Sequence, residues 1–195
     1  MHQKLKMFRL GIILLIVGSL VSCGAKEGTP ASTQVAVDKM VPKHKAQAVL
    51  DSLGIELPEI KAPVANYVHV TQAGNLLFLA GKGPRNEAGE LIKGKLGQDM
   101  TVEEGYAAAR KVGIMQIAVL KSHLGDLSKV KQILKVKGMV NATPDFTEHP
   151  EVINGYSDLM VQVFGSAGKH ARAAVGMGSL PRGLCTEIEM VVETW

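Results

Sequence analysis

The two cysteines are the most reactive side chains of the chain, and their surroundings predict different roles. Cys23 ends the sequence LVSC, which resembles a bacterial lipobox, where a small residue precedes a cysteine whose thiol takes a diacylglycerol before cleavage. Cys185 lies in an alternating, strand-like segment with no adjacent histidine, so we expect a small apolar strand residue rather than a nucleophile. Lipidation would consume Cys23, and a structural disulfide is therefore not expected.

Arg172, Glu187 and Glu189 are the charged residues of the C-terminal third that are best suited to chemistry. The planar fork of an arginine binds a carboxylate through two hydrogen bonds. The two glutamates alternate with Ile188 and Met190, which places both acids on one face of a strand. Spacing alone leaves the plain alternative open, in which these three residues are solvated parts of surface strands.

The sequence contains none of the spaced ligand sets that bind metals. It has no CxxC or HExxH motif and no pair of histidines at helical spacing, so we expect no metal site. His69 and His170 have no partner beside them in sequence, which favours structural or exposed roles. The segment GKGPRN (81–86) lacks the third glycine of a dinucleotide-binding loop, and Pro84 removes an amide that a phosphate would use.

The residues before Cys23 have the composition of a signal peptide. Three basic residues precede a twelve-residue apolar run, LGIILLIVGSLV, which is short of the roughly 20 residues that span a bilayer. We therefore expect a lipoprotein signal peptide over residues 1–22, a flexible tether over 23–42 and a folded domain over 43–195. An ordinary secretory leader followed by an incidental cysteine is the alternative.

A lipid on Cys23 implies a protein anchored to a membrane of the cell envelope. Gly24 follows the cysteine, at the position where enteric bacteria use aspartate to retain lipoproteins in the inner membrane. We therefore expect the outer membrane, with the domain facing the periplasm.

The charge of the domain argues against nucleic-acid binding. Three of the 22 lysines and arginines precede residue 23 and no acid does, so the remainder holds 19 basic and 18 acidic residues. A nearly neutral body has no electrostatic attraction to a phosphate backbone. Aromatic residues are only 4% of the chain, which disfavours a stacking platform for single-stranded nucleic acid.

Periodicity and turn residues predict the elements that position these side chains. Thr101 and Glu104 form a capping box for a long helix, and Pro150 opens a second one. The expected elements are a short helix at 42–53, hairpin strands at 67–71 and 76–80, a helix from 101 to about 123, a strand at 130–140, a helix from 150 to about 164, and strands at 172–177 and 184–192.

This order of elements predicts an α+β domain of two layers. We expect a mixed, largely antiparallel β-sheet with two long helices on one face. The other face, or an edge, stays uncovered, and such a surface usually meets another subunit.

The C-terminal third resembles the YjgF/RidA family signature. In that signature an arginine, an apolar strand, a Leu-Pro turn and an I-E-[MI] strand follow one another, as RAAVGMGSLP (172–181) and EIEM (187–190) do here. Three upstream segments also match: NY (66–67) before the hairpin, LAG (79–81) at its end and GDL (125–127) before the third strand. The long loop over residues 85–99 and the strand sequence HARAAVG (170–176) resemble the chorismate-mutase-like second branch of the family more closely than its core.

The resemblance covers roughly residues 50–193 and implies a chorismate-mutase-like fold that forms a homotrimer. It also implies active sites in clefts between subunits, where core members hydrolyse reactive enamine and imine intermediates to 2-keto acids and ammonia. By position, Arg172 matches the carboxylate-binding arginine of the family and Glu187 its acid. Tyr67 matches the aromatic hydroxyl before the hairpin, and Gly81 the backbone that lines the pocket.

A 2-imino acid presents a carboxylate beside an electrophilic C=N carbon. Arg172 fits as the cation for the carboxylate, and Glu187 fits as the group that orients or deprotonates the attacking water. Tyr67 fits as a hydrogen-bond partner of the substrate nitrogen or the water, with a place at the edge of the core as its alternative. No cofactor is expected, because the imine carbon is already activated.

Three functions follow from the resemblance. The first is a lipid-anchored enamine/imine deaminase, whose partners are a small 2-imino or 2-keto acid, further copies of the chain and the membrane. The second is a non-enzymatic protein that binds small carboxylates, because the cell envelope is far from the cytoplasmic enzymes that release such intermediates. Endoribonuclease activity, an attribute of parts of the family, is third, and the near-neutral body argues against it.

Overall fold

The structure is a computed structural model that describes residues 45–63 and 65–195. The expected signal peptide, Cys23 and the tether lie outside the described residues. The elements, in chain order, are α2 (Ala46–Ser52), β1 (Val70–Ala73), β2 (Leu76–Lys82), α3 (Val102–Leu124), β3 (Val130–Asn141), α4 (His149–Phe164), β4 (Ala171–Met177) and β5 (Thr186–Thr194). No helix of this described part is long and apolar enough to cross a membrane.

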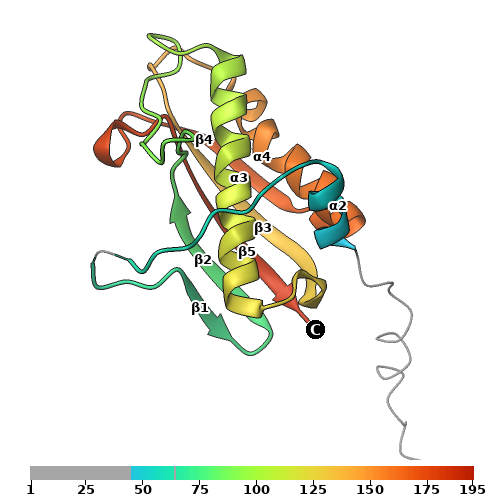
Figure 1. Cartoon of the computed structure of the whole chain (residues 1–195). Coiled ribbons are helices and arrows are strands. Elements are labelled where there is room, and N and C mark those ends of the chain that lie inside the picture. Colours follow the sequence, from blue (N-terminus) through green and yellow to red (C-terminus); the bar gives the residue numbers. More distant parts are fainter. Residues whose placement is uncertain (1–44, 64) are drawn as a thin grey trace, which may run out of the picture. The chain divides into compact units, whose positions relative to one another are not determined.

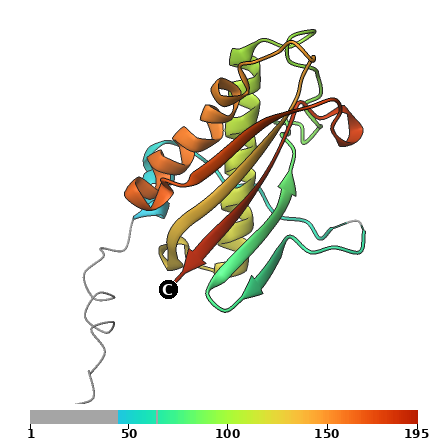
Figure 2. The ribbon, with the colours of Figure 1, turned by 180° about the vertical axis from the view of Figure 1, so that it is seen from behind.

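The sheet confirms the predicted two-layer α+β architecture. Its strand order is β1-β2-β5-β3-β4, with β3 and β4 parallel and the other neighbouring pairs antiparallel. The long helices α3 and α4 cover one face (Figure 1). Figure 2, seen from behind, shows the other face with no described element over it. We call this surface the open face.

The first hairpin strand is shorter than the pattern predicts. β1 begins at Val70, opposite Leu79, and Tyr67 lies before it in an irregular segment. The pairing of β2 with β5 has a register shift between Leu79 and Lys82. A bulge of this kind bends a strand and changes the direction of the side chains that follow it. The end of β2 is therefore the place where the regular ladder gives way.

Local sequence explains where the long helices begin and end. Thr101 Oγ1 accepts a hydrogen bond from the N–H of Glu104 at 3.2 Å, and the Glu104 carboxylate accepts one from the N–H of Thr101 at 2.9 Å. Gly125, with φ of 75°, ends α3 in a conformation that favours glycine. Pro150 lies in the first turn of α4, where its missing N–H costs no bond within the helix.

Helices α3 and α4 pack closely because glycines line their contact. A Cβ on Gly155 of α4 would overlap the backbone carbonyl of Tyr106 in α3. At Gly113 of α3, the methyl groups of Leu159 occupy the space that a side chain would need. This close contact fixes the spacing of α3 and α4 on the sheet.

The core lies between the sheet and these helices. Its fully buried apolar side chains include Leu77, Ile133, Val136, Val140, Ile188 and Val192 of the strands and Val112, Ile117, Val152, Tyr156 and Leu159 of the helices. On the open face, by contrast, Phe78 is 43% exposed and Val175 is 37% exposed. Exposed apolar residues on an uncovered sheet face indicate a surface that another molecule covers.

Candidate functional site

Glu187 and Gly81 lie side by side on the neighbouring strands β5 and β2. Ile188 is buried in the core, so the alternation of a strand directs Glu187 to the open face. A Cβ on Gly81 would overlap the Glu187 carboxylate, and glycine therefore lets this carboxyl lie against the β2 backbone. Partial burial and the charge of Glu189 raise the pKa of Glu187, and Lys82 partly offsets this. A carboxyl with a raised pKa is suited to accept and return a proton.

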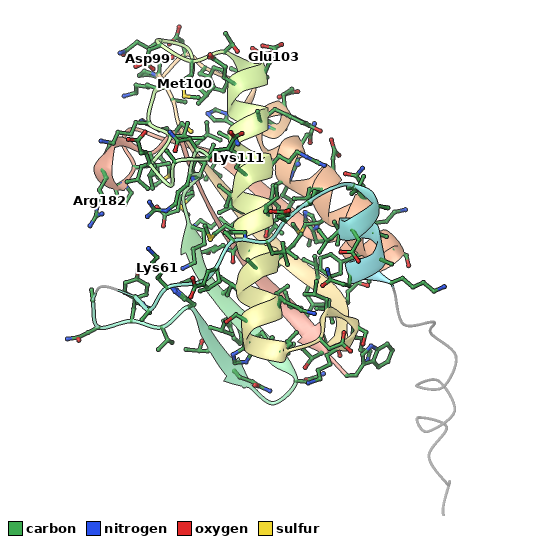
Figure 3. The ribbon with its side chains drawn as sticks, viewed as in Figure 1. Lys61, Asp99, Met100, Glu103, Lys111 and Arg182 are labelled. Atoms are coloured by element: carbon green, nitrogen blue, oxygen red, sulfur yellow. The ribbon has the colours of Figure 1, made fainter. Side chains whose placement is uncertain are left out.

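Lys82 and His69 lie next to Gly81, at the end of β2. The sequence patterns do not identify Lys82 as a site residue. Lys82 Nζ lies 2.7 Å from His69 Nδ1, and His69 Nε2 lies 2.8 Å from the carbonyl oxygen of Lys61. Lys61, labelled in Figure 3, lies on the segment that leads from α2 toward β1. The only sequence signal for Lys82 is its position between two glycines at the end of a β-rich run.

Tyr67 lies at the outer side of this group. Its ring packs edge-on against His69, with 6.3 Å between the ring centroids. The side chain is 51% exposed, so Tyr67 contributes little to the core of this subunit. Tyr67, His69, Lys82, Gly81 and Glu187 form one contiguous group, which we call the lysine cluster.

Arg172 lies in a second group, formed by β4 and α4. Its Nη1 donates hydrogen bonds to Asn154 Oδ1 at 2.8 Å and to Ser157 Oγ at 3.1 Å. Within the described residues, no carboxylate lies at ion-pair distance from Arg172, and its Nε and Nη2 have no hydrogen-bond partner. The half-buried guanidinium is therefore held in place by neutral groups, with donors left for an acceptor from outside.

His170 continues this second group, which we call the arginine cluster. His170 Nδ1 lies 2.6 Å from the carbonyl oxygen of Gly168, which can only accept, so Nδ1 holds the proton. Nε2 then accepts from the hydroxyl of Ser157 at 3.1 Å. Burial and the nearby charge of Arg172 lower the pKa of His170, against the opposing effect of the Gly168 carbonyl. The chain of bonds from Arg172 through Ser157 to Gly168 thus requires a neutral imidazole.

We expect acid to destabilise the domain through His170. Its pKa is lower in the folded than in the unfolded chain, so stability present above the ordinary pKa of about 6.5 is lost as the pH falls below it. The free energy of unfolding in urea, measured between about pH 7 and pH 5, should fall less steeply for His170→Gln than for the parent. Equal slopes for the two proteins would contradict the assignment of a buried neutral histidine.

Arg172 and Glu187 lie on opposite faces of the sheet within one subunit. Arg172 stands in register with Val136 of β3, which pairs with Met190 of β5, three residues beyond Glu187. The two backbone positions are therefore about 10 Å apart across the sheet and about 10 Å apart along it. Arg172 reaches α4 on the helical side, whereas Glu187 points to the open face. One subunit does not bring Arg172 and Glu187 together.

The remaining candidates show no chemistry in the described part of the chain. Cys185 is buried and free, but it lies in a bend before β5 begins at Thr186 and not in the strand that the alternation predicts. Burial raises its pKa to about 11. A thiol with so high a pKa is a poor nucleophile. The described residues hold no group of three or more His, Cys, Asp or Glu side chains arranged for a metal ion.

Known proteins match this chain over most of the described domain. A family model for YjgF/chorismate mutase-like, putative endoribonuclease, matches residues 47–190. Protein TCP17 of Trypanosoma cruzi is 42% identical over 155 residues, which are 79% of this chain and 97% of that protein.

Solved structures of similar proteins have the same fold as this domain. A protein of unknown function from Agrobacterium tumefaciens is 40% identical, with a TM-score of 0.71 over 77% of this chain and 94% of its own. A putative endoribonuclease from Shewanella oneidensis is 36% identical, with a TM-score of 0.72 over 76% of this chain and 98% of its own. The extent of these matches shows that the chain belongs to the YjgF/chorismate mutase-like family and has its fold.

Proposed function

We propose that this protein hydrolyses reactive 2-enamine and 2-imino acids to 2-keto acids and ammonia, in clefts between the subunits of a homotrimer. The observation on which this proposal rests is Arg172. Its guanidinium is half-buried, fixed by Asn154 and Ser157, and has no acidic partner among the described residues. Nε and Nη2 together present the two parallel donors that bind a carboxylate.

Glu187 supplies the second requirement, which is a group that handles the proton of the attacking water. Its carboxyl lies partly buried against Gly81, and its pKa is raised. In the ionised form it takes a proton from water as the oxygen attacks the imine carbon, and it returns that proton to the departing nitrogen. Tyr67, a member of the same cluster, supplies a hydroxyl for the substrate nitrogen.

A trimer supplies the third requirement, because Arg172 and Glu187 of one subunit face apart. The exposed Phe78 and Val175 support an assembly that covers the open face. In such an assembly the arginine cluster of one subunit meets the lysine cluster of the next. The lipobox-like sequence supports attachment of each subunit to a membrane through Cys23, hence a place in the cell envelope.

The arginine cluster on its own favours a second candidate, a protein that binds small carboxylates without reaction. Arg172 needs no second cluster to hold a 2-keto acid. Binding without turnover is therefore the expected behaviour if the subunits do not share their sites.

The test is release of 2-keto acid from freshly generated 2-iminopropanoate and 2-iminobutanoate by the full chain. We expect Glu187→Gln to lower turnover by about 10²- to 10⁴-fold, because it removes the proton acceptor. Gly81→Ala should also lower turnover while changing the melting temperature little, because the clash is with the mobile end of the Glu187 side chain rather than with backbone.

The matched control is Glu189→Gln, the next acid on the same face of β5. This change removes a charge that raises the pKa of Glu187, so turnover should persist with its pH profile shifted to lower pH. Keto-acid release equal to the uncatalysed rate in the parent would refute hydrolysis. Saturable binding of pyruvate in that case would favour the second candidate, and cleavage of RNA instead would favour a ribonuclease.

A further inference from the structure

Lys82 has an unusual hydrogen-bond partner for a lysine, namely a histidine that serves as its base. The carbonyl oxygen of Lys61 can only accept, so His69 Nε2 holds the ring proton and donates it at 2.8 Å. His69 Nδ1 of the neutral ring is then an acceptor, 2.7 Å from Lys82 Nζ. The Lys61 carbonyl therefore selects the tautomer of His69 that can take a proton from Lys82.

The surroundings of Lys82 favour loss of that proton. No carboxylate of residues 45–63 and 65–195 lies at ion-pair distance from its Nζ. Burial lowers the pKa of Lys82, and the charge of Glu187 offsets this only in part. A lysine with a lowered pKa is a nucleophile toward carbonyl and imine carbons.

Lys82 also lies where the reaction is proposed to occur. It follows Gly81, on which the Glu187 carboxylate rests, and it pairs with Ile188, the residue after Glu187. The charge of Glu187 raises the pKa of Lys82 and the charge of Lys82 lowers the pKa of Glu187, so the two charged groups lie close enough to affect each other. The nucleophile and the acid that activates water are thus neighbours within one subunit.

We propose that Lys82 is a catalytic residue that forms a covalent imine with C2 of 2-imino and 2-keto acids, with His69 as its base. The substrate class rests on the proposed function. The carboxylate of the substrate is held by Arg172 of the adjacent subunit, and the lysine nitrogen attacks the carbon beside that carboxylate.

The steps balance without an oxidant or a cofactor. Lys82 transfers a proton to His69, and the free amine adds to C2 of the protonated imine. The bond from C2 to the original nitrogen breaks, and ammonia leaves and takes the proton from His69 to become ammonium. Water, deprotonated by Glu187, then adds to C2 of the lysine imine. The proton that Glu187 took from water passes to Nζ, the C2–Nζ bond breaks as the C2 hydroxyl becomes a carbonyl, and the departing amine takes the hydroxyl proton. The 2-keto acid, protonated Lys82 and ionised Glu187 result.

The reverse of the last step gives the experiment, because a 2-keto acid alone should form the same imine. The full chain is incubated with pyruvate and sodium borohydride, which reduces an imine to a stable secondary amine, and its peptides are analysed by mass spectrometry. We expect one reduced pyruvate adduct on Lys82, and none at any residue of Lys82→Arg. His69→Gln should slow adduct formation at least about tenfold near neutral pH and shift its pH profile upward.

Lys95 is the matched control within the same protein. It is also partly buried, but its Nζ donates to the carbonyl oxygen of Gly178 at 3.0 Å and has no base beside it. Equal labelling of Lys95 and Lys82 would overturn the proposal, as would unlabelled Lys82 in a protein that hydrolyses imino acids. In the latter case the proposed function stands without the covalent step. Labelled Lys82 in a protein without turnover supports the imine and removes the hydrolysis.

Discussion

Arg172→Ala is expected to lower turnover of 2-imino acids roughly 30-fold to several thousand-fold, which corresponds to a loss of about 2 to 5 kcal/mol. The reason is that, in the proposed reaction, this guanidinium serves as the partly desolvated cation for the substrate carboxylate. Arg172→Lys keeps the charge but loses the two parallel donors, so it should recover only part of the rate. Keto-acid release and pyruvate affinity measure the effect.

Arg110→Ala is the matched control for this prediction. Arg110 also bonds a neutral side chain of α4, since its Nη2 donates to Gln162 Oε1 at 2.8 Å, but it extends from α3 away from the sheet clusters. The Arg110→Ala variant should therefore turn over 2-imino acids at the rate of the parent. If both Arg172 variants bind pyruvate as the parent does and melt several degrees lower, Arg172 is structural and the enzymatic proposal loses its main residue.

The proposed site between subunits can also be tested by mixing Arg172→Ala subunits with Glu187→Gln subunits. Arg172→Ala and Glu187→Gln subunits, each inactive alone, should regain part of the activity when they are unfolded together and refolded as a mixture. A mixed assembly contains interfaces in which an intact Arg172 meets an intact Glu187. Mixing without any recovery, in a protein that light scattering shows to be a mixed trimer, would exclude a site built from these two residues of different subunits.

Gly155→Ala is expected to destabilise the domain by about 2 kcal/mol or more, because the new methyl group overlaps the backbone carbonyl of Tyr106. The higher helix propensity of alanine, worth about 1 kcal/mol, offsets only part of this cost. Thermal unfolding should show a midpoint lower by roughly 5 °C or more.

Two other glycines calibrate the effect of Gly155. Gly178 has open space around it, so Gly178→Ala should change the stability by less than about 0.5 kcal/mol. Gly113→Ala meets only side chains of Leu159 and Met160, which can move, and should fall between the two. A Gly155→Ala protein as stable as Gly178→Ala would show that α3 and α4 are farther apart than described.

Regular elements were predictable from the sequence because their signals are local. Thr101 and Glu104 lie three residues apart, and the alternation of Glu187 with Ile188 needs only neighbouring positions. The same holds for Pro150 at the start of α4. Such local features are enough to predict the helices and the face of Glu187 without any tertiary contact.

Contacts within the two clusters were not predictable, because they depend on bulges and on helix docking. Lys82 contacts His69 where the pairing of β2 becomes irregular. No turn residue in the sequence indicates this irregularity. Arg172 meets Asn154 and Ser157 because α4 packs over β4, which is a tertiary contact that no local sequence signal encodes. The histidines were expected to be structural or exposed because their partners are distant in sequence. His170 bonds Gly168 and Ser157, whereas His69 bonds Lys82, a partner that lies 13 positions away in the sequence.

The place of β5 in the sheet has a consequence for how the chain is made. β5 is the last strand in the sequence but lies between β2 and β3, and its pair Leu77 with Val192 joins residues more than 100 positions apart. The hairpin and the β3–β4 pair therefore have no shared ladder until β5 has been synthesised, and closing such long loops makes folding slow. A nascent chain of this topology cannot complete its sheet, and so is not fully folded, during most of its synthesis. That is the state in which an export channel accepts a polypeptide, and it suits the leader that the sequence predicts.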